Sequence, residues 1–209
     1  MPELGLFPLP LVLVPTERIP LHIFEPRYRE LIAECLERDE EFGLVLATGD
    51  GAVHEVGTRA AVAQVVEELD DGRLNIVVEG RERFRLLELT KGRSFTTGEV
   101  EEVVDDADDV PDDDDRERAL DVFRELAETA GAEVDVPDAA SPLLDFELAA
   151  RVDFGVESKQ ELLASTSPRE RMTKLLALLE TALEALRLEQ QLQHRASGNG
   201  KVSPLAPDS

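Results

Sequence analysis

Two short segments bring together side chains that could take part in binding or in chemistry. The first, PLHIFEPRY at 20–28, contains His22, Glu25, Arg27 and Tyr28 where an extended segment meets an expected helix. Such side chains can hydrogen-bond or pair across the turn and fix the helix to the sheet. The alternative is a polar rim beside a peptide-binding groove.

The second segment, EGRERF at 79–84, supplies Arg81 and Arg83 as positive charges in a strongly acidic chain. These arginines either pair with local carboxylates or bind an acidic group of a partner. The six candidate peptide-binding residues of the two segments are His22, Glu25, Arg27, Tyr28, Arg81 and Arg83.

Motifs of the common enzyme classes are absent from the sequence. There is no G-x-x-x-x-G-K-[ST] loop, no G-x-G-x-x-G after a strand and no G-x-S-x-G elbow. His22, His54 and His194 are not spaced as metal ligands. Cys35 falls on the apolar face of its expected helix, where a thiol acts as a small hydrophobic group. We predict no catalytic residue, cofactor or metal; a hydrolase would need catalytic residues converging from remote positions.

Around these segments, the first half of the chain has a β-rich pattern with one helix. Prolines keep the chain extended up to Phe24, and Pro26 fits the first turn of a helix. The apolar face of that helix is predicted to consist of Tyr28, Leu31, Ile32, Cys35 and Leu36.

Short strands are expected at 42–46 and through 56–104. Asp71-Gly72 indicates a hairpin turn and Gly80 a bend or bulge. Several strands with a single inserted helix favour a small, closed or half-open barrel.

The second half of the chain is predicted to be helical, after the acidic run at 105–115 that has almost nothing to bury. A helix begins after Pro111 and ends at Gly131. The starts expected for three further helices are Ser141-Pro142, Ser158 with Glu161, and Ser167-Pro168 with Glu170. The last helix runs to about residue 193, so its far end could contact a partner or a second copy of the chain.

Composition and charge limit the function classes. The 209 residues include 46 acidic and 22 basic residues, for a net charge of −24, which repels nucleic acid and anionic membranes. Aromatic residues are only 4% of the total, so stacking platforms for bases are disfavoured. A single cysteine and the lack of a signal-peptide pattern or a 20-residue apolar span predict a cytoplasmic protein.

Three stretches in order, LGLFPLPLVLVPTERIPLHIFEPRYRELI, FGLVL with VGTRAAVAQVVEELDDGRLNIVVEGRERFRLLEL, and KQELLASTSPRERMTKLLALLE, closely resemble the N-terminal substrate-binding domain of Lon-type ATP-dependent proteases. The resemblance covers about residues 4–190. VPTER at 14–18 differs from the usual turn of the family, and the Asp-rich run is unusually acidic for it.

The resemblance implies an α+β fold, with a PUA-like β pseudobarrel carrying one inserted helix, followed by a C-terminal helical bundle that ends in a long helix. The corresponding boundaries are 1–104 for the barrel, 105–115 for an acidic linker and helix start, 116–194 for the bundle and 195–209 for a disordered tail. The family's ATPase and protease domains are not expected, because this chain ends before either could begin, as in a stand-alone bacterial form.

The function predicted from this resemblance is a non-enzymatic module that binds unfolded or partner proteins and peptides between barrel and bundle, in protein quality control. The alternative is a small-molecule-sensing or RNA-associated PUA-like domain; the charge disfavours RNA but not a neutral ligand. No nucleic acid or membrane partner is expected, and the long C-terminal helix could support a homo-oligomer.

Overall fold

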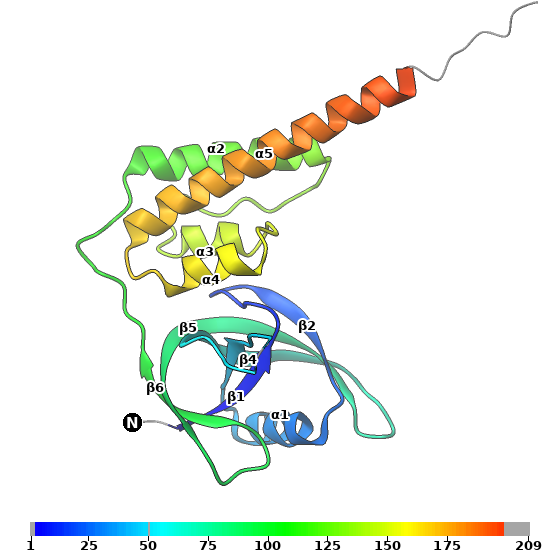
Figure 1. Cartoon of the computed structure of the whole chain (residues 1–209), viewed down its shortest axis with the longest axis vertical. Coiled ribbons are helices and arrows are strands. Elements are labelled where there is room, and N and C mark those ends of the chain that lie inside the picture. The colour runs from blue at the N-terminus through cyan, green and yellow to red at the C-terminus, as the bar shows by residue number, and fades with distance from the viewer. Residues whose placement is uncertain (1–2, 50, 199–209) are drawn as a thin grey trace, which may run out of the picture.

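The structure, a computed structural model, describes residues 3–49 and 51–198 as a mixed β-sheet followed by a group of helices (Figure 1). The strands are β1 (Glu3–Leu9), β2 (Arg18–Ile23), β3 (Phe42–Leu46), β4 (Val56–Glu68), β5 (Leu74–Thr90) and β6 (Thr97–Glu102). The helices are α1 (Pro26–Arg38), α2 (Asp113–Ala130), α3 (Leu144–Ala149), α4 (Val156–Ala164) and α5 (Pro168–Gly198).

The sheet closes on itself because β5, with 17 residues, is long enough to pair with three other strands. Its order is β2-β5-β4-β3-β1-β6, and β6 pairs back onto β5, so five strands form a closed ring with β2 attached outside it. Only the β1–β3 pair is parallel among the strand pairs of the described residues. We call this closed unit the barrel; the predicted α+β class is confirmed as a mixed sheet with a long C-terminal helix.

Helix α1 covers the end of the barrel that faces away from the other helices (Figure 1). Its predicted inner face is confirmed for Tyr28, Leu31, Ile32 and Cys35, which are buried. The expectation for Leu36 is wrong, since its side chain is 44% exposed. At about 100° per residue, Leu36 lies roughly 90° from the centre of the buried stripe.

Two glycines of the barrel have the roles that turn chemistry predicts. Gly72 has a φ of 79° and its N–H donates to the carbonyl of Leu69 over 2.8 Å, so the hairpin between β4 and β5 is confirmed. Next to Gly80, the pairing of β5 with β4 shifts register between Thr58 and Ala60, in agreement with the predicted bend or bulge. The β1–β2 loop crosses β5 at Gly80. The N–H of Thr16 donates to the Gly80 carbonyl, and the Gly80 N–H donates to that of Glu17, each over 2.9 Å.

Helices α2 and α5 lie side by side, and α3 and α4 fill the space between this pair and the barrel (Figure 1). Leu120 and Phe123 of α2 are buried with Leu175 and Leu179 of α5 in one apolar cluster. Gly131, with a φ of 66°, ends α2 as predicted. None of the helices within residues 3–49 and 51–198 is long and apolar enough to cross a lipid bilayer.

Two of the expected helix starts are corrected. Helix α3 begins at Leu144, with Leu143 as its N-cap, and not at Ser141-Pro142. Helix α4 begins at Val156, so Ser158 lies inside it, and its N-cap is Gly155 with a φ of 80°. The glycine reaches a backbone conformation that a serine rarely adopts. The cap at Ser167 is confirmed, because its hydroxyl accepts a hydrogen bond from the Glu170 N–H over 3.0 Å.

The long C-terminal helix is longer than the sequence predicts. Helix α5 continues to Gly198, which places 195–198 in a helix and not in the expected disordered tail. The rest of that predicted tail, 199–209, lies outside the described residues. Only the last turns of α5 project beyond α2 (Figure 1), because Arg187 still pairs with Glu125 and Gln190 still donates to the Thr129 carbonyl.

We predict that Gly80→Ala destabilises the chain. A Cβ at Gly80 would lie 2.1 Å from the Val14 carbonyl oxygen, so backbone must shift. Such overpacking costs about 1–3 kcal/mol, measurable by urea unfolding. Gly49→Ala is the matched control, because nothing lies within 4 Å of a Cβ there. Equal stabilities of the two variants would contradict the close approach.

Candidate functional site at the barrel–bundle junction

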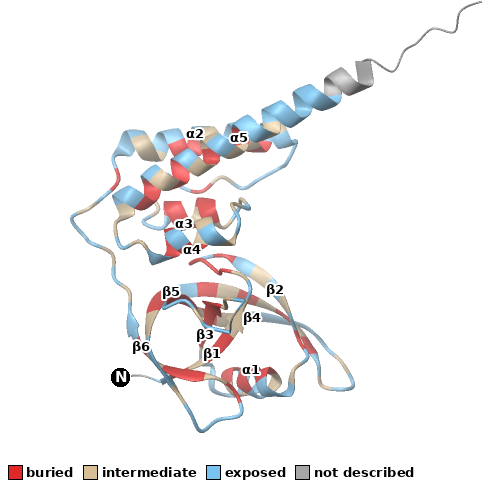
Figure 2. Cartoon of the chain, in the orientation of Figure 1, coloured by how far each residue is buried: buried red, intermediate tan, exposed pale blue. Residues whose placement is uncertain are grey.

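The barrel and the helices share an apolar interface. Val12 and Val14 of the β1–β2 loop and Val56 of β4 pack in one buried cluster with Phe146 of α3 and Leu163 of α4. Figure 2 shows buried residues on both sides of this junction, on α3 and α4 and on the facing strands. Because this contact removes apolar surface of both halves from water, it stabilises their packing against each other.

A cluster of four charged side chains, Arg83, Asp105, Asp145 and Arg171, lies beside this interface. Three of them are buried, and Asp105 is partly exposed. Arg171 is only 2% exposed; its Nε donates to Asp145 over 2.6 Å, and its Nη1 and Nη2 donate to the two oxygens of Asp105 over 2.9 and 2.7 Å. Arg83 also donates to Asp105. Two positive and two negative charges therefore neutralise one another, as buried charges require.

The same two arginines form contacts that connect the barrel, α3 and the start of α5. Nη1 of Arg83, on β5, donates to the carbonyl oxygen of Leu163 at the end of α4 over 2.8 Å and to that of Ser165 just after α4 over 2.6 Å. Both guanidinium groups also lie over the Phe146 ring, at 5.3 Å for Arg83 and 4.3 Å for Arg171. The barrel, α3 and the start of α5 are thus held in one fixed arrangement.

Asp105 is ionised within this cluster. Burial alone would raise its pKa, but hydrogen bonds from Arg171 and the positive charges of Arg171 and Arg83 outweigh burial and hold the pKa below its ordinary value. Its stabilising contribution is therefore complete above the pKa of an unfolded aspartate and is lost as pH falls through the lowered pKa. The prediction that the acidic run has almost nothing to bury is wrong at this residue.

Two polar contacts support the other side of the junction. Lys159 of α4 donates to Glu17 over 2.6 Å, and Nε2 of Gln160 donates to the Val56 carbonyl over 3.0 Å. Among the described side chains, Oε1 of Gln160 is buried without a hydrogen-bond partner. This costs stability at the interface, because a buried unpaired acceptor loses its hydration.

A groove of about 520 Å³ opens where the barrel meets α3, and we call it the barrel–bundle groove. The residues that line it are Pro15, Thr16, Glu79, Gly80, Arg81, Glu82, Arg83, Glu102, Val103, Val104, Asp105, Pro142, Leu143 and Phe146. Val104 is 68% exposed and Leu143 is 37% exposed, so large apolar side chains face solvent across it. Its volume lies within the range of ligand-binding clefts.

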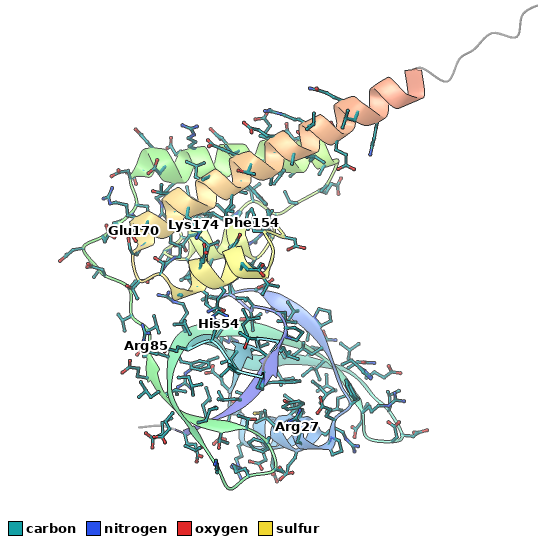
Figure 3. All side chains as sticks on the ribbon, in the orientation of Figure 1. Arg27, His54, Arg85, Phe154, Glu170 and Lys174 are labelled. Atoms are coloured by element: carbon teal, nitrogen blue, oxygen red, sulfur yellow. The ribbon has the colours of Figure 1, made fainter. Side chains whose placement is uncertain are left out.

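The structure separates the six predicted peptide-binding residues into two places. His22, Glu25, Arg27 and Tyr28 lie where β2 meets α1, and Arg27 is at the barrel end far from the bundle (Figure 3). Only Arg81 and Arg83 line the barrel–bundle groove. A common site for all six residues therefore does not form.

The β2–α1 residues bond mainly to one another and to the adjacent barrel. Nδ1 of His22 donates to Asn75 over 2.7 Å, and Nε of Arg27 donates to Glu25 over 2.9 Å. Arg27 covers one face of Tyr28 at 4.5 Å, while the Tyr28 ring stacks on Phe7 at 4.0 Å between ring centres. These contacts agree with the interpretation that the segment fixes the helix to the sheet. A peptide contact at the β2–α1 junction stays a prediction.

The two arginines of the second segment differ in exposure. The side chain of Arg81 is 46% exposed and pairs with Glu79 over 2.8 Å at the groove. The side chain of Arg83 is 4% exposed and binds inside the charged cluster. Arg83 therefore forms part of the buried lining of the groove, whereas Arg81 lies at its surface.

Sequence reasoning missed the apolar residues of the groove. Val104 lies two residues after the end of β6 and precedes the acidic run, while Leu143 follows the Ser141-Pro142 helix signal. In each case the available sequence signal was an apolar residue at the boundary of an expected element. Nothing in the sequence indicates that these two boundaries meet in space.

Other candidate features give no second site for chemistry. A pocket of about 530 Å³ lies between the barrel and α4, with His54 among its lining residues and at the junction (Figure 3). Burial raises the pKa of the Cys35 thiol to about 11, so this thiol is a poor nucleophile. Among residues 3–49 and 51–198, no group of three His, Cys, Asp or Glu side chains could hold a metal ion.

We predict that Arg171→Met destabilises the whole chain, whereas Arg169→Met does not. Removing Arg171 leaves Asp145 buried without its ion-pair partner, which costs about 3–5 kcal/mol. Arg169 pairs with Asp109 and Asp112 at the surface, where ion pairs contribute little. Thermal unfolding of both variants checks the contrast, and an unchanged melting temperature for Arg171→Met would contradict the role of the cluster.

Comparison with known proteins places this geometry in a family. Residues 3–181 match the family of the ATP-dependent protease La (LON) substrate-binding domain. Curated relatives include Lon protease 1 of Hydrogenovibrio crunogenus, 25% identical over 88% of this chain and 24% of its own length. Another is the Lon protease of Paraburkholderia phytofirmans, 27% identical over 95% of this chain and 27% of its own length. This chain therefore spans about a quarter of the length of these relatives.

Two solved structures have a similar fold. The Lon N-terminal domain protein from Xanthomonas campestris is 27% identical, with a TM-score of 0.66 over 85% of this chain and 98% of that one. The N-terminal domain of the Mycobacterium avium complex Lon protease is 16% identical, with a TM-score of 0.64 over 86% and 98%, and supports the fold alone. The match over most of its residues, together with this fold, shows that the chain belongs to the Lon substrate-binding domain family.

Proposed function

We propose that this chain is a polypeptide-recognition module that binds apolar segments of unfolded or partner proteins in the barrel–bundle groove. The observation that carries the proposal is the exposure of Val104 and Leu143 among the residues that line the groove. Apolar side chains exposed across a shaped groove favour contact with apolar groups of a partner. The family match to a substrate-binding domain supports the same conclusion.

The walls of the groove suit this role because they are fixed before a partner arrives. Phe146 is 1% exposed and lies against two guanidinium groups that are themselves held by aspartates. A groove that is already ordered loses less conformational entropy on binding. A short apolar segment can therefore bind without a large conformational change of the chain.

The proposal also covers the activity, cellular role, fold type and self-association of the module. The module has no catalytic activity of its own and acts in protein quality control in the cytoplasm. The closed mixed barrel supports its classification as PUA-like. Association of two copies through α5 stays a prediction, for which the exposed Leu188 and Leu192 offer an apolar surface.

Small-molecule sensing is the second candidate function. The pocket beside α4, at about 530 Å³, has the size of a small-ligand site and favours this candidate. The net charge of −24 disfavours an RNA-associated role. A neutral ligand bound beside α4 would leave the barrel–bundle groove unoccupied, so the two functions can be tested separately.

We predict that the paired substitution Val104→Ser and Leu143→Ser weakens peptide binding. The probe is a fluorescein-labelled peptide with a five-residue core of Leu and Phe between Ser/Gly flanks, followed by fluorescence anisotropy. Burying an aliphatic side chain contributes about 1.5–3 kcal/mol, so we expect the Kd to rise at least about tenfold.

The matched control is the pair Leu188→Ser and Leu192→Ser, which removes similar exposed apolar side chains from α5. We expect the control to keep the affinity of the unchanged chain. Equal weakening in both pairs, or none in the groove pair, would contradict the proposed site. Circular dichroism checks that each variant is folded.

A further inference from the structure

The charges that line the barrel–bundle groove are not balanced. Four lining residues are acidic (Glu79, Glu82, Glu102 and Asp105) and two are basic (Arg81 and Arg83). An unpaired charge beside an apolar groove influences which polypeptide can bind there, because opposite charges attract and like charges repel. The ion pairs of each lining residue show where the imbalance lies.

Two of the four carboxylates are neutralised within the chain. Glu79 pairs with Arg81 over 2.8 Å and also with Arg18. Asp105 lies in the charged cluster with Arg83 and Arg171. These contacts use the charges of both lining arginines, so neither arginine is left to balance the remaining carboxylates.

Glu82 and Glu102 are the remaining carboxylates. Both are exposed, and neither forms an ion pair or a side-chain hydrogen bond within residues 3–49 and 51–198. Glu82 lies on β5 between Arg81 and Arg83, and Glu102 ends β6 two residues before the exposed Val104. The barrel wall of the groove therefore carries two free negative charges beside its apolar surface.

Among the described residues that line the groove, those from the helical side are uncharged and do not offset these carboxylates. The lining residues from the helical side are Pro142, Leu143 and Phe146. The net charge of −24 on the whole chain adds a negative field around the groove. A partner with acidic residues beside its apolar segment would meet repulsion from the barrel wall, and one with basic residues would meet attraction.

We propose that the groove selects apolar polypeptide segments flanked by lysine or arginine, and that Glu82 and Glu102 set this preference. The inference depends on the proposed function, because it names the class of segment that binds in the same groove. The apolar core of the segment packs on Val104 and Leu143, while its basic flanks pair with the two carboxylates. Such exposed pairs are individually weak, so their effect is a preference between segments and not the main source of affinity.

The test compares three fluorescein-labelled peptides that share one core of Leu and Phe residues but have Lys, Ser/Gly or Glu flanks. Fluorescence anisotropy gives each Kd for the full chain at about 20 mM and about 500 mM salt. At low salt we expect the Lys-flanked peptide to bind about tenfold more tightly than the Glu-flanked one, with the Ser/Gly-flanked peptide between them. At high salt this difference should largely vanish, because the charges are screened.

The residue assignment is tested with the pair Glu82→Gln and Glu102→Gln. We expect this variant to lose most of the Lys-over-Glu preference while its affinity for the Ser/Gly-flanked peptide stays unchanged. The charge-reversed pair Glu82→Lys and Glu102→Lys should favour the Glu-flanked peptide. The matched control, Glu37→Gln with Glu133→Gln, removes two exposed carboxylates outside the groove and should keep the preference.

The outcomes separate this inference from the proposed function. Equal affinities for the Lys- and Glu-flanked peptides would overturn the inference alone, provided the Ser/Gly-flanked peptide still requires Val104 and Leu143. An equal loss of the Lys-over-Glu preference in the control pair would also overturn the inference, because the preference would then come from the net negative charge of the whole chain. If substitution of Val104 and Leu143 leaves binding of the Ser/Gly-flanked peptide unchanged, the proposed function itself fails.

Discussion

The burial of Arg83 and Arg171 between the barrel and the helices constrains the rest of this structure. A guanidinium group cannot be left unpaired away from water, so each arginine must meet carboxylates or carbonyl oxygens at the junction. Asp105 accepts hydrogen bonds from both arginines, and Asp145 accepts one from Arg171. The end of β6, the start of α3 and the start of α5 must therefore converge on one point.

This convergence also creates the barrel–bundle groove. Phe146 fills the space beneath the two guanidinium groups, while Val104 and Leu143 on either side of the cluster remain exposed. The stable core of the junction and its apolar surface are thus neighbouring parts of one arrangement. A buried ion cluster contributes little net stability compared with apolar packing, so its main effect here is on geometry.

Local patterns predicted much of the fold but little of the candidate site. Gly72 and Gly131 require positive φ angles, and Ser167 caps a helix, so their roles follow from a few neighbouring residues. The pairing of Asp105 with Arg171 joins positions 66 residues apart, and nothing local distinguishes Asp105 from the other aspartates of its run. The sequence therefore identified the acidic stretch but not that Asp105 is the aspartate that pairs with both buried arginines.

Hydrogen exchange measured by mass spectrometry tests most directly whether polypeptides bind in the barrel–bundle groove. The full chain would be compared with and without a saturating amount of the Ser/Gly-flanked peptide. The account predicts new protection in 80–83, 103–105 and 142–146, the segments that meet at the groove. Protection confined to the β2–α1 junction at 22–28, or to α4 and the pocket beside it, would contradict the account.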